Sequence, residues 1–328
     1  IIGNQGEKSV KITFIGVGGI TRSYRQSLNQ LERPIAAVCD INAERGVTIA
    51  TEENATAYTD HGEMLQKEKP DVVFICIPPG AHTTQVADSA ASGAAVFVAK
   101  PVAQDLVTAQ HARDAIAAAN VINQVGYMAR YSDITAKAKE LVGDRQLTMG
   151  IGRFLTRMGA NHPWWGKYEV SRGQMVEQTT HVFDLIRYFL GDVVNVHAYG
   201  IKGVSEGITD FEECTVCNMQ FESGAVGNIT STCVARAHDN FATELVGDDF
   251  YLKLTHDLGL RGQISGEAID YTGTEAGYFR QVAQFVKAVE ANDQGLVIAP
   301  YADAVKSLAV TLAANRSLET GQVERVVA

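Results

Sequence analysis

The first third of the chain alternates short apolar runs with amphipathic segments, and this alternation limits the possible folds more than any other feature. β-Branched runs separated by helical patterns are typical of βαβ units, which build a parallel sheet covered by helices. We expect six strands, at residues 10–15, 35–40, 55–58, 71–77, 95–98 and 121–125. We expect five helices between them, at residues 21–31, 43–53, 61–68, 83–92 and 104–120. The sequence therefore predicts a doubly wound α/β domain over residues 1–125.

After residue 125 the pattern changes from βα alternation to hairpins. Glu222-Ser223-Gly224 and Gly247-Asp248-Asp249 are turn sequences, each between two alternating runs. The expected strands cover residues 149–158, 213–221, 225–235, 241–246 and 250–254, and the expected helices cover 133–142, 174–190, 277–291 and 301–318. This pattern predicts an α+β second domain over residues 126–328.

Composition excludes several classes of protein. The 328 residues are 46% hydrophobic and 20% charged, which is typical of globular chains of about two domains. No apolar run approaches the roughly 18 residues of a membrane helix, and a net charge of −10 argues against nucleic-acid binding. Five cysteines on predicted strands favour reduced, buried thiols, and thus a cytoplasmic protein. The chain begins without methionine or a leader pattern, so a native and a trimmed terminus both stay open.

A glycine-rich turn follows the first predicted strand and opens the first predicted helix. Gly16, Gly18, Gly19 and Ile20 lie in the segment Gly16-Val17-Gly18-Gly19-Ile20-Thr21, with Thr21 where the usual pattern has Gly or Ala. Such a turn brings backbone N–H groups and a helix N-terminus to a pyrophosphate. The alternative is a tight turn without a ligand.

Asp40 ends the second predicted strand, where a carboxylate accepts hydrogen bonds from the adenosine ribose of NAD and repels the 2′-phosphate of NADP. NAD is therefore favoured, although Arg45 nearby keeps NADP open. The alternative for Asp40 is a helix cap.

Two later loops follow the fourth and fifth strands, on the same side of the sheet, and their expected cofactor contacts are Ile77, Pro78, His82 and Lys100. A solvated loop lysine is the alternative for Lys100.

The predicted helix over 174–190 carries Glu177, His181, Asp184 and Tyr188 near one face, which suggests the lining of a cleft. Histidine is the commonest general base; a surface Glu–His pair is the alternative. Trp164 and Trp165, in His162-Pro163-Trp164-Trp165, are either platforms for a sugar or core residues. No metal is expected, because Cys214 and Cys217 point to opposite faces of a strand and lack a second ligand pair.

Taken together, these segments resemble the glucose-fructose oxidoreductase / inositol dehydrogenase / MocA family. The resemblance rests on the glycine turn, Asp40, Ile77-Pro78-Pro79-Gly80-Ala81-His82, Lys100-Pro101, Gly126-Tyr127-Met128-Ala129-Arg130-Tyr131 and Glu177-Gln178-Thr179-Thr180-His181-Val182-Phe183-Asp184. It covers residues 10–200 by motif and the remainder by length and hairpin pattern. It implies a Rossmann domain with a bound nicotinamide cofactor. It also implies a second domain whose large, mostly antiparallel open sheet forms a homodimer or homotetramer.

The resemblance also implies roles for individual residues. The family's catalytic lysine, in a Glu-Lys-Pro motif, corresponds to Lys100, which follows Ala99 here. Its acid and histidine correspond to Glu177 and His181, and Met128 stands where many members have Asn. Lys100, His181 and Glu177 are thus the expected catalytic residues. The expected substrate contacts are Lys100, Tyr127, Arg130, Trp164, Trp165, Glu177, His181 and Asp184.

The resulting hypothesis is a dehydrogenase that transfers a hydride between NAD, or less favourably NADP, and a hydroxyl or ketone of a sugar, cyclitol or related polyol. His181 would act as the base, Lys100 would stabilise the alkoxide, and Glu177 would orient His181 or hold a substrate hydroxyl. One alternative is an NAD-dependent glycosidase that oxidises its sugar transiently, with no net redox change. Another is a dinucleotide-binding regulator without catalytic activity.

Overall fold

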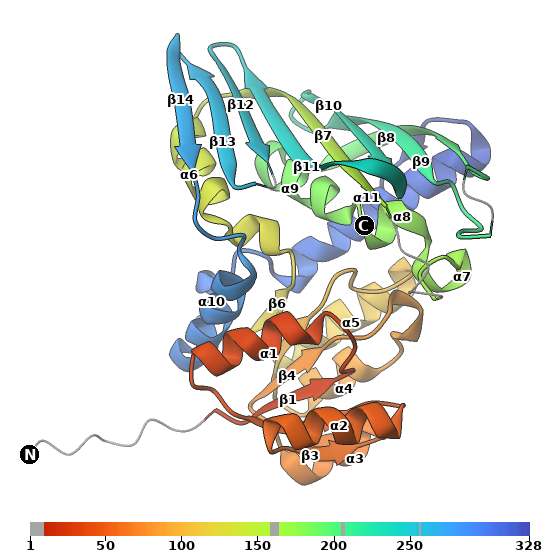
Figure 1. Cartoon of the computed structure of the whole chain (residues 1–328), viewed down its shortest axis with the longest axis vertical. Coiled ribbons are helices and arrows are strands. Elements are labelled where there is room, and N and C mark those ends of the chain that lie inside the picture. Colours follow the sequence, from red (N-terminus) through yellow and green to blue (C-terminus); the bar gives the residue numbers. More distant parts are fainter. Residues whose placement is uncertain (1–9, 158–163, 205–206, 256) are drawn as a thin grey trace, which may run out of the picture.

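The computed structural model describes residues 10–157, 164–204, 207–255 and 257–328, and it contains two sheets stacked along the long axis of the molecule (Figure 1). The first is a six-stranded parallel sheet in the order β3-β2-β1-β4-β5-β6. Its strands are β1 (Ile12–Ile15), β2 (Ile35–Cys39), β3 (Thr56–Tyr58), β4 (Val72–Ile75), β5 (Ala95–Val98) and β6 (Asn123–Val125). The helices between them are α1 (Thr21–Gln30), α2 (Ala43–Glu53), α3 (His61–Glu68), α4 (Gln85–Ala91) and α5 (Leu106–Ala119). The predicted doubly wound α/β fold is confirmed.

Local sequence signals set where these helices begin. The side chains of Asn42, Asp60 and Asp105 accept a hydrogen bond from a backbone N–H in the first turn of α2, α3 and α5. Such N-caps satisfy donors that have no partner within the helix. Strands β1, β4 and β5 are almost wholly apolar and buried, as expected for a parallel sheet covered on both faces.

The second sheet has nine strands in the order β14-β13-β12-β11-β7-β10-β9-β8-β15. All neighbours are antiparallel except β10 and β7, which run parallel with Val226 opposite Met149. The strands are β7 (Leu147–Arg157), β8 (Val193–Ile201), β9 (Cys214–Phe221), β10 (Val226–Thr232), β11 (Val234–Gly247), β12 (Phe250–Thr255), β13 (Gly259–Ile264), β14 (Glu267–Thr272) and β15 (Glu324–Arg325). This is the large, mostly antiparallel sheet that the resemblance implied.

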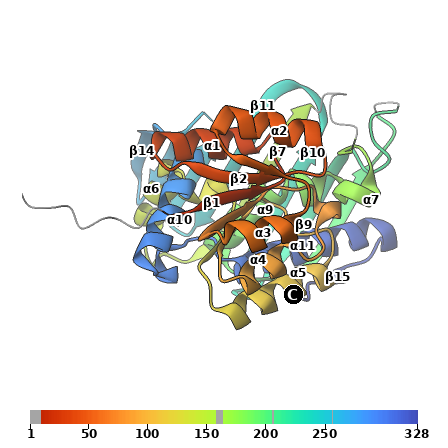
Figure 2. The same cartoon turned by 90° about the horizontal axis from the view of Figure 1, so that it is seen from below.

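Helices cover one face of the nine-stranded sheet, and no helix of the described residues covers the other (Figure 1). The covering helices are α6 (Asp133–Val142), α8 (Gly173–Glu177), α9 (Thr180–Leu190) and α11 (Tyr301–Thr320). Helix α10 (Tyr278–Ala291) instead returns to the nucleotide half, where it lies beside α1 (Figure 2). Its Phe285 packs edge-on against Phe74 and Phe97 of β4 and β5. The two halves therefore share part of the nucleotide domain's core.

One predicted helix is interrupted in the structure. The segment 174–190 forms α8 and α9, with a break at Gln178 and Thr179. The carbonyl of Glu177 accepts a hydrogen bond from Lys100 Nζ, while the N–H of His181 bonds to Gln178 O. A side chain from the other domain thus enters the helical hydrogen-bond ladder, which is a recognised cause of a kink.

The strands of the second sheet also differ from expectation. The predicted strands 225–235 and 241–246 are β10 and the much longer β11, and β7 lies between them. Strands β8, β13, β14 and β15 were not predicted.

No helix in the described part of the chain is both long and apolar enough to cross a membrane. All five cysteines are free thiols, and four of them are buried, which agrees with their predicted reduced state.

Candidate active site

The glycine turn after β1 leaves an open surface at the N-terminus of α1. Gly16 has a φ of +80°, and a Cβ there would collide with the Cys76 carbonyl and with Ile77. A Cβ on Gly18 or Gly19 would meet nothing within 4 Å. The turn therefore requires glycine at position 16, and it leaves free space above Gly18 and Gly19. This geometry fits a diphosphate held by backbone N–H groups.

Asp40, at the end of β2, is only 4% exposed and accepts four hydrogen bonds. Val17 N and Arg45 Nε donate to Oδ2, at 2.9 Å each. Asn42 N donates to Oδ1 at 2.8 Å, and the second Arg45 donor reaches Oδ1 at 2.7 Å. Burial favours a higher pKa for Asp40, but the Arg45 hydrogen bond and the two backbone donors outweigh it and lower the pKa. The carboxylate is therefore charged and fixed beside the glycine turn.

The loops after β4 and β5 follow the carboxyl ends of neighbouring parallel strands, at the same edge of the sheet as the glycine turn. Ile77 and Pro78 are half-exposed, and a short 3₁₀ turn, Pro79–Ala81, leads to the buried His82. Burial lowers the pKa of His82 to about 4, so its ring is neutral at physiological pH. Gln104 Oε1 is buried without a hydrogen-bond partner among the described residues. Sequence reasoning did not identify Gln104, which belongs to no motif.

Lys100 and Glu177 meet from the two domains although they are 77 residues apart. Lys100 Nζ lies 2.8 Å from Glu177 Oε1 and 2.5 Å from the Glu177 carbonyl oxygen. Trp165 Nε1 donates to the other carboxylate oxygen, Oε2. Both side chains of the ion pair are about 15% exposed. The acid that pairs with Lys100 therefore comes from the second domain, whereas the adjacent residue is Ala99.

His181, in the first turn of α9, lies next to this ion pair. Burial lowers the pKa of His181 well below its usual value, and the charge of Lys100 lowers it further. The Tyr127 ring meets the imidazole edge to face, with centroids 6.1 Å apart, and the Tyr127 hydroxyl is 3.0 Å from Thr180 Oγ1. His181 Nδ1 has no hydrogen-bond partner among the described residues. A neutral imidazole beside an ammonium can accept a proton from a hydroxyl.

Arg130 and Asp184, both predicted to contact substrate, are buried and bound to each other instead. Arg130 donates to the two Asp184 carboxylate oxygens at 2.7 and 2.6 Å. Asp303 and Arg187 extend this pair into a charge network, with Arg130 and Arg187 each 2.6 Å from an Asp303 oxygen. Exposures of 4% for Arg130 and 1% for Asp184 leave little surface for a ligand. The structure thus gives them a role in holding α9 and α11 together, which differs from the prediction.

The two tryptophans have different surroundings. Trp165 is 3% exposed and packs against Phe211, with ring centroids 5.3 Å apart. It is therefore a core residue that presents its N–H to Glu177, and not an open platform for a sugar. Trp164 is half-buried beside it, while His162 and Pro163 lie outside the described residues.

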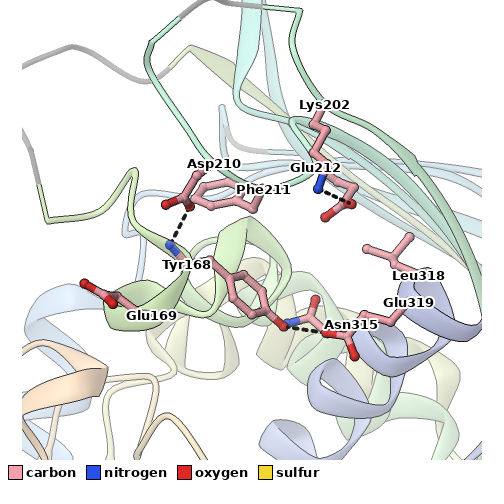
Figure 3. Close-up of a pocket in the computed structure, with 9 residues that line it drawn as sticks. All are labelled: Tyr168, Glu169, Lys202, Asp210, Phe211, Glu212, Asn315, Leu318 and Glu319. Atoms are coloured by element: carbon pink, nitrogen blue, oxygen red, sulfur yellow. Dashed lines mark hydrogen bonds and ion pairs between the residues drawn. The ribbon is translucent and has the colours of Figure 1, made fainter.

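A separate hollow of about 410 Å³ is lined in part by Phe211 (Figure 3). Its lining includes Tyr168, Lys202, Glu212 and Asn315, and it does not include Lys100, Glu177 or His181.

Comparison with known families matches both halves of the chain. Residues 10–127 match the profile described as oxidoreductase family, NAD-binding Rossmann fold, and residues 136–253 match the GFO/IDH/MocA C-terminal domain. The chain belongs to the Gfo/Idh/MocA family. Its first domain is accordingly an NAD-binding Rossmann domain, and the free space at the glycine turn fits the diphosphate of that cofactor.

Individual relatives of this family member are distant. The chain is 24% identical to the scyllo-inositol 2-dehydrogenase (NAD(+)) of Bacillus subtilis, over 96% of each chain. It is 26% identical to the myo-inositol 2-dehydrogenase of Thermotoga maritima, over 68% of each. Among solved structures, levoglucosan dehydrogenase in complex with NADH and levoglucosan superposes with a TM-score of 0.88 at 17% identity, covering 98% of this chain and 100% of that one. At that identity the superposition shows the shared fold.

Proposed function

We propose that this member of the family is an NAD-dependent dehydrogenase that acts on a secondary hydroxyl of a sugar, cyclitol or related polyol. The observation that carries the proposal is the meeting of Lys100 with Glu177 and His181 at the border between the two domains. That border lies at the carboxyl ends of the parallel strands, beside the glycine turn, where ligands of doubly wound sheets bind. The names of the inositol dehydrogenases among the relatives support this substrate class.

Each of the three side chains has a distinct task in this reaction. Bound NAD supplies the hydride acceptor at its nicotinamide ring. His181, neutral because its pKa is lowered, takes the proton of the hydroxyl, a contribution typically of about 10²–10⁴-fold. Lys100 donates a hydrogen bond to the developing alkoxide. Glu177 holds the Lys100 ammonium in place. The two predicted roles of Glu177, orienting His181 or holding a substrate hydroxyl, stay predictions.

Two alternatives lead to different products. An NAD-dependent glycosidase would release an aglycone without lasting NADH, and a regulator would bind NAD without converting any sugar. The partly buried ion pair of Lys100 and Glu177 favours an enzyme over a regulator, because charges partly withdrawn from water are costly unless well paired. A pure binding domain has no evident need of that arrangement.

The test is a panel of sugars, cyclitols and their aryl glycosides, incubated with NAD while NADH absorbance and aglycone release are both recorded. We expect lasting NADH formation with at least one polyol. Lys100→Met and His181→Gln should each lower turnover by about 100-fold or more and keep NADH binding. Lys306→Met, which removes an exposed ion pair on α11, is the matched control. Full turnover in either active-site variant would contradict its role.

We also propose a homodimer or homotetramer formed through the open face of the nine-stranded sheet. Exposed apolar side chains gather there, including Tyr199 opposite Val216 and Met149 opposite Val226. Clustered apolar surface of this kind marks an interface in many proteins. Light scattering on the purified chain, compared with Val216→Lys and Val226→Lys, tests this.

The free thiols further support a reducing compartment, the cytoplasm.

A further inference from the structure

The Asp40 carboxylate has no acceptor position left for a ribose hydroxyl. An ionised carboxylate offers about four lone-pair positions. In this chain Val17 N, Asn42 N and two donors of Arg45 occupy four. A ribose hydroxyl that donates to Asp40 must therefore displace one of these donors.

Arg45 is the donor that can leave. The N–H groups of Val17 and Asn42 belong to the backbone, next to the glycine turn and at the N-cap of α2. The Arg45 side chain is 48% exposed, whereas the side chain of its partner Asp40 is 2% exposed. Rotation of Arg45 into solvent leaves Asp40 with its two backbone hydrogen bonds. It also opens the two acceptor positions that the ribose of NAD requires.

With Arg45 in place, the same site suits a 2′-phosphate. The Asp40–Arg45 pair has no net charge, so it repels a phosphate less than a bare carboxylate does. Arginine carries five N–H donors, and two are used on Asp40, which leaves three. A planar guanidinium binds phosphate well through such donors.

Helix α2 adds to this environment. It begins at Ala43, directly after Asn42, and its positive N-terminal end lies beside Arg45. Gly46, in its first turn, would place a Cβ 3.7 Å from the Asp40 Cβ, so the helix start is packed close to the carboxylate. The acid in this turn, Glu44, is exposed, and no described ion pair holds it against Arg45.

We infer that this chain binds NADP as well as NAD and that Arg45 is the residue that sets the ratio between them. The inference rests on the NAD-binding domain and does not depend on which substrate is oxidised. Arg45 is here a specificity residue for the dinucleotide: it rotates away from Asp40 for NAD and bridges Asp40 to the 2′-phosphate for NADP.

The experiment measures binding without any sugar. The purified full chain is titrated with NADH and with NADPH, and nicotinamide fluorescence gives both dissociation constants. We expect the wild-type constant for NADPH to lie within about 100-fold of that for NADH. Hydrogen bonds to charged groups contribute about 1.5–3 kcal/mol, so Arg45→Met should weaken NADPH relative to NADH by about tenfold or more. Absolute NADH binding should stay equal or become tighter.

Arg113→Met is the matched control, because Arg113 forms an exposed ion pair with Asp114 on α5 and should leave both constants unchanged. Two results would overturn the inference: a wild-type preference for NADH above about 100-fold, or a shift in the ratio below about tenfold in Arg45→Met. Far-UV circular dichroism checks folding. If the Met variant is unfolded, Arg45→Gln is titrated under the same criteria. Loss of sugar oxidation with both dinucleotides still bound would refute the proposed function and leave this inference standing.

Discussion

Replacement of Arg130 by Met removes the cation at the centre of the buried charge network. Arg130 makes three short hydrogen bonds to carboxylates, two to Asp184 and one to Asp303. Asp303 is 28% exposed and keeps Arg187 as a partner. Asp184 is 1% exposed and keeps only the Ser307 hydroxyl, at 2.8 Å, among its described side-chain partners. The variant therefore leaves one carboxylate buried without a cation in contact with it.

The expected loss in the free energy of unfolding follows from the partners that the two carboxylates keep. Removal of one partner of a buried ion pair costs about 3–5 kcal/mol. Methionine fills much of the volume of the arginine stem, so a cavity adds little. The double variant Arg130→Met with Asp184→Leu removes both charges and should recover most of the loss. By contrast, Arg316→Met removes an ion pair that is 43% exposed on the Arg316 side and should cost at most about 1 kcal/mol.

Urea unfolding followed by far-UV circular dichroism measures these differences, and NADH titration of the folded variants shows whether the nucleotide domain stays intact. The stabilising role of Arg130 would be refuted if Arg130→Met unfolded at the wild-type urea concentration. If that variant also raised the KM for the sugar found in the panel, the originally predicted substrate contact would be the better explanation.

Three further predictions concern the site. Gly16→Ala should weaken NADH binding by about tenfold or more, because the added Cβ would meet the Cys76 carbonyl. Gly224→Ala is the control, since Gly224 has a similar φ of +85° but open space around it, and it should leave NADH binding unchanged. Equal NADH binding by both variants would contradict the role of the glycine turn in holding the dinucleotide. His181 should titrate below pH 6.5 by NMR, so its basic form persists into mildly acid solution, and Lys100→Met should move the titration upward; a pKa at or above 6.5 in the wild type argues against burial as the cause. Trp165→Phe keeps the packing on Phe211 but removes the donor to Glu177, so turnover should fall while NADH affinity stays, and unchanged turnover would show that this hydrogen bond is dispensable.

Local sequence patterns were sufficient for most of the nucleotide domain. The predicted bounds of the helix Ala43–Glu53 and the strand Ala95–Val98 agree with the structure to the residue. N-caps, apolar periodicity and turn residues act over only a few positions, so they can be recognised without knowledge of the fold. The glycine turn followed by Asp40 belongs to the same class of local signal.

Contacts between residues that are far apart in the sequence could not be predicted from such local patterns. The side chain of Lys100 interrupts the helix at Glu177, and no glycine or proline in 174–190 marks that break. Arg130 and Asp184 looked like cleft residues because both are ionisable and lie in family motifs. The fold pairs them out of reach of solvent. The position of β7 between β11 and β10 likewise depends on pairings between residues up to about 100 positions apart.

The sequence by itself therefore determined the class of fold and predicted a dinucleotide site and a set of reactive side chains, because each depends on short-range patterns of polarity and turn chemistry. Only the tertiary structure decided which charges face each other. That choice is made by burial, because a carboxylate or ammonium withdrawn from water must find an opposite charge nearby. The packing of α11 against α9 and against α5 of the nucleotide half determines which charge is near.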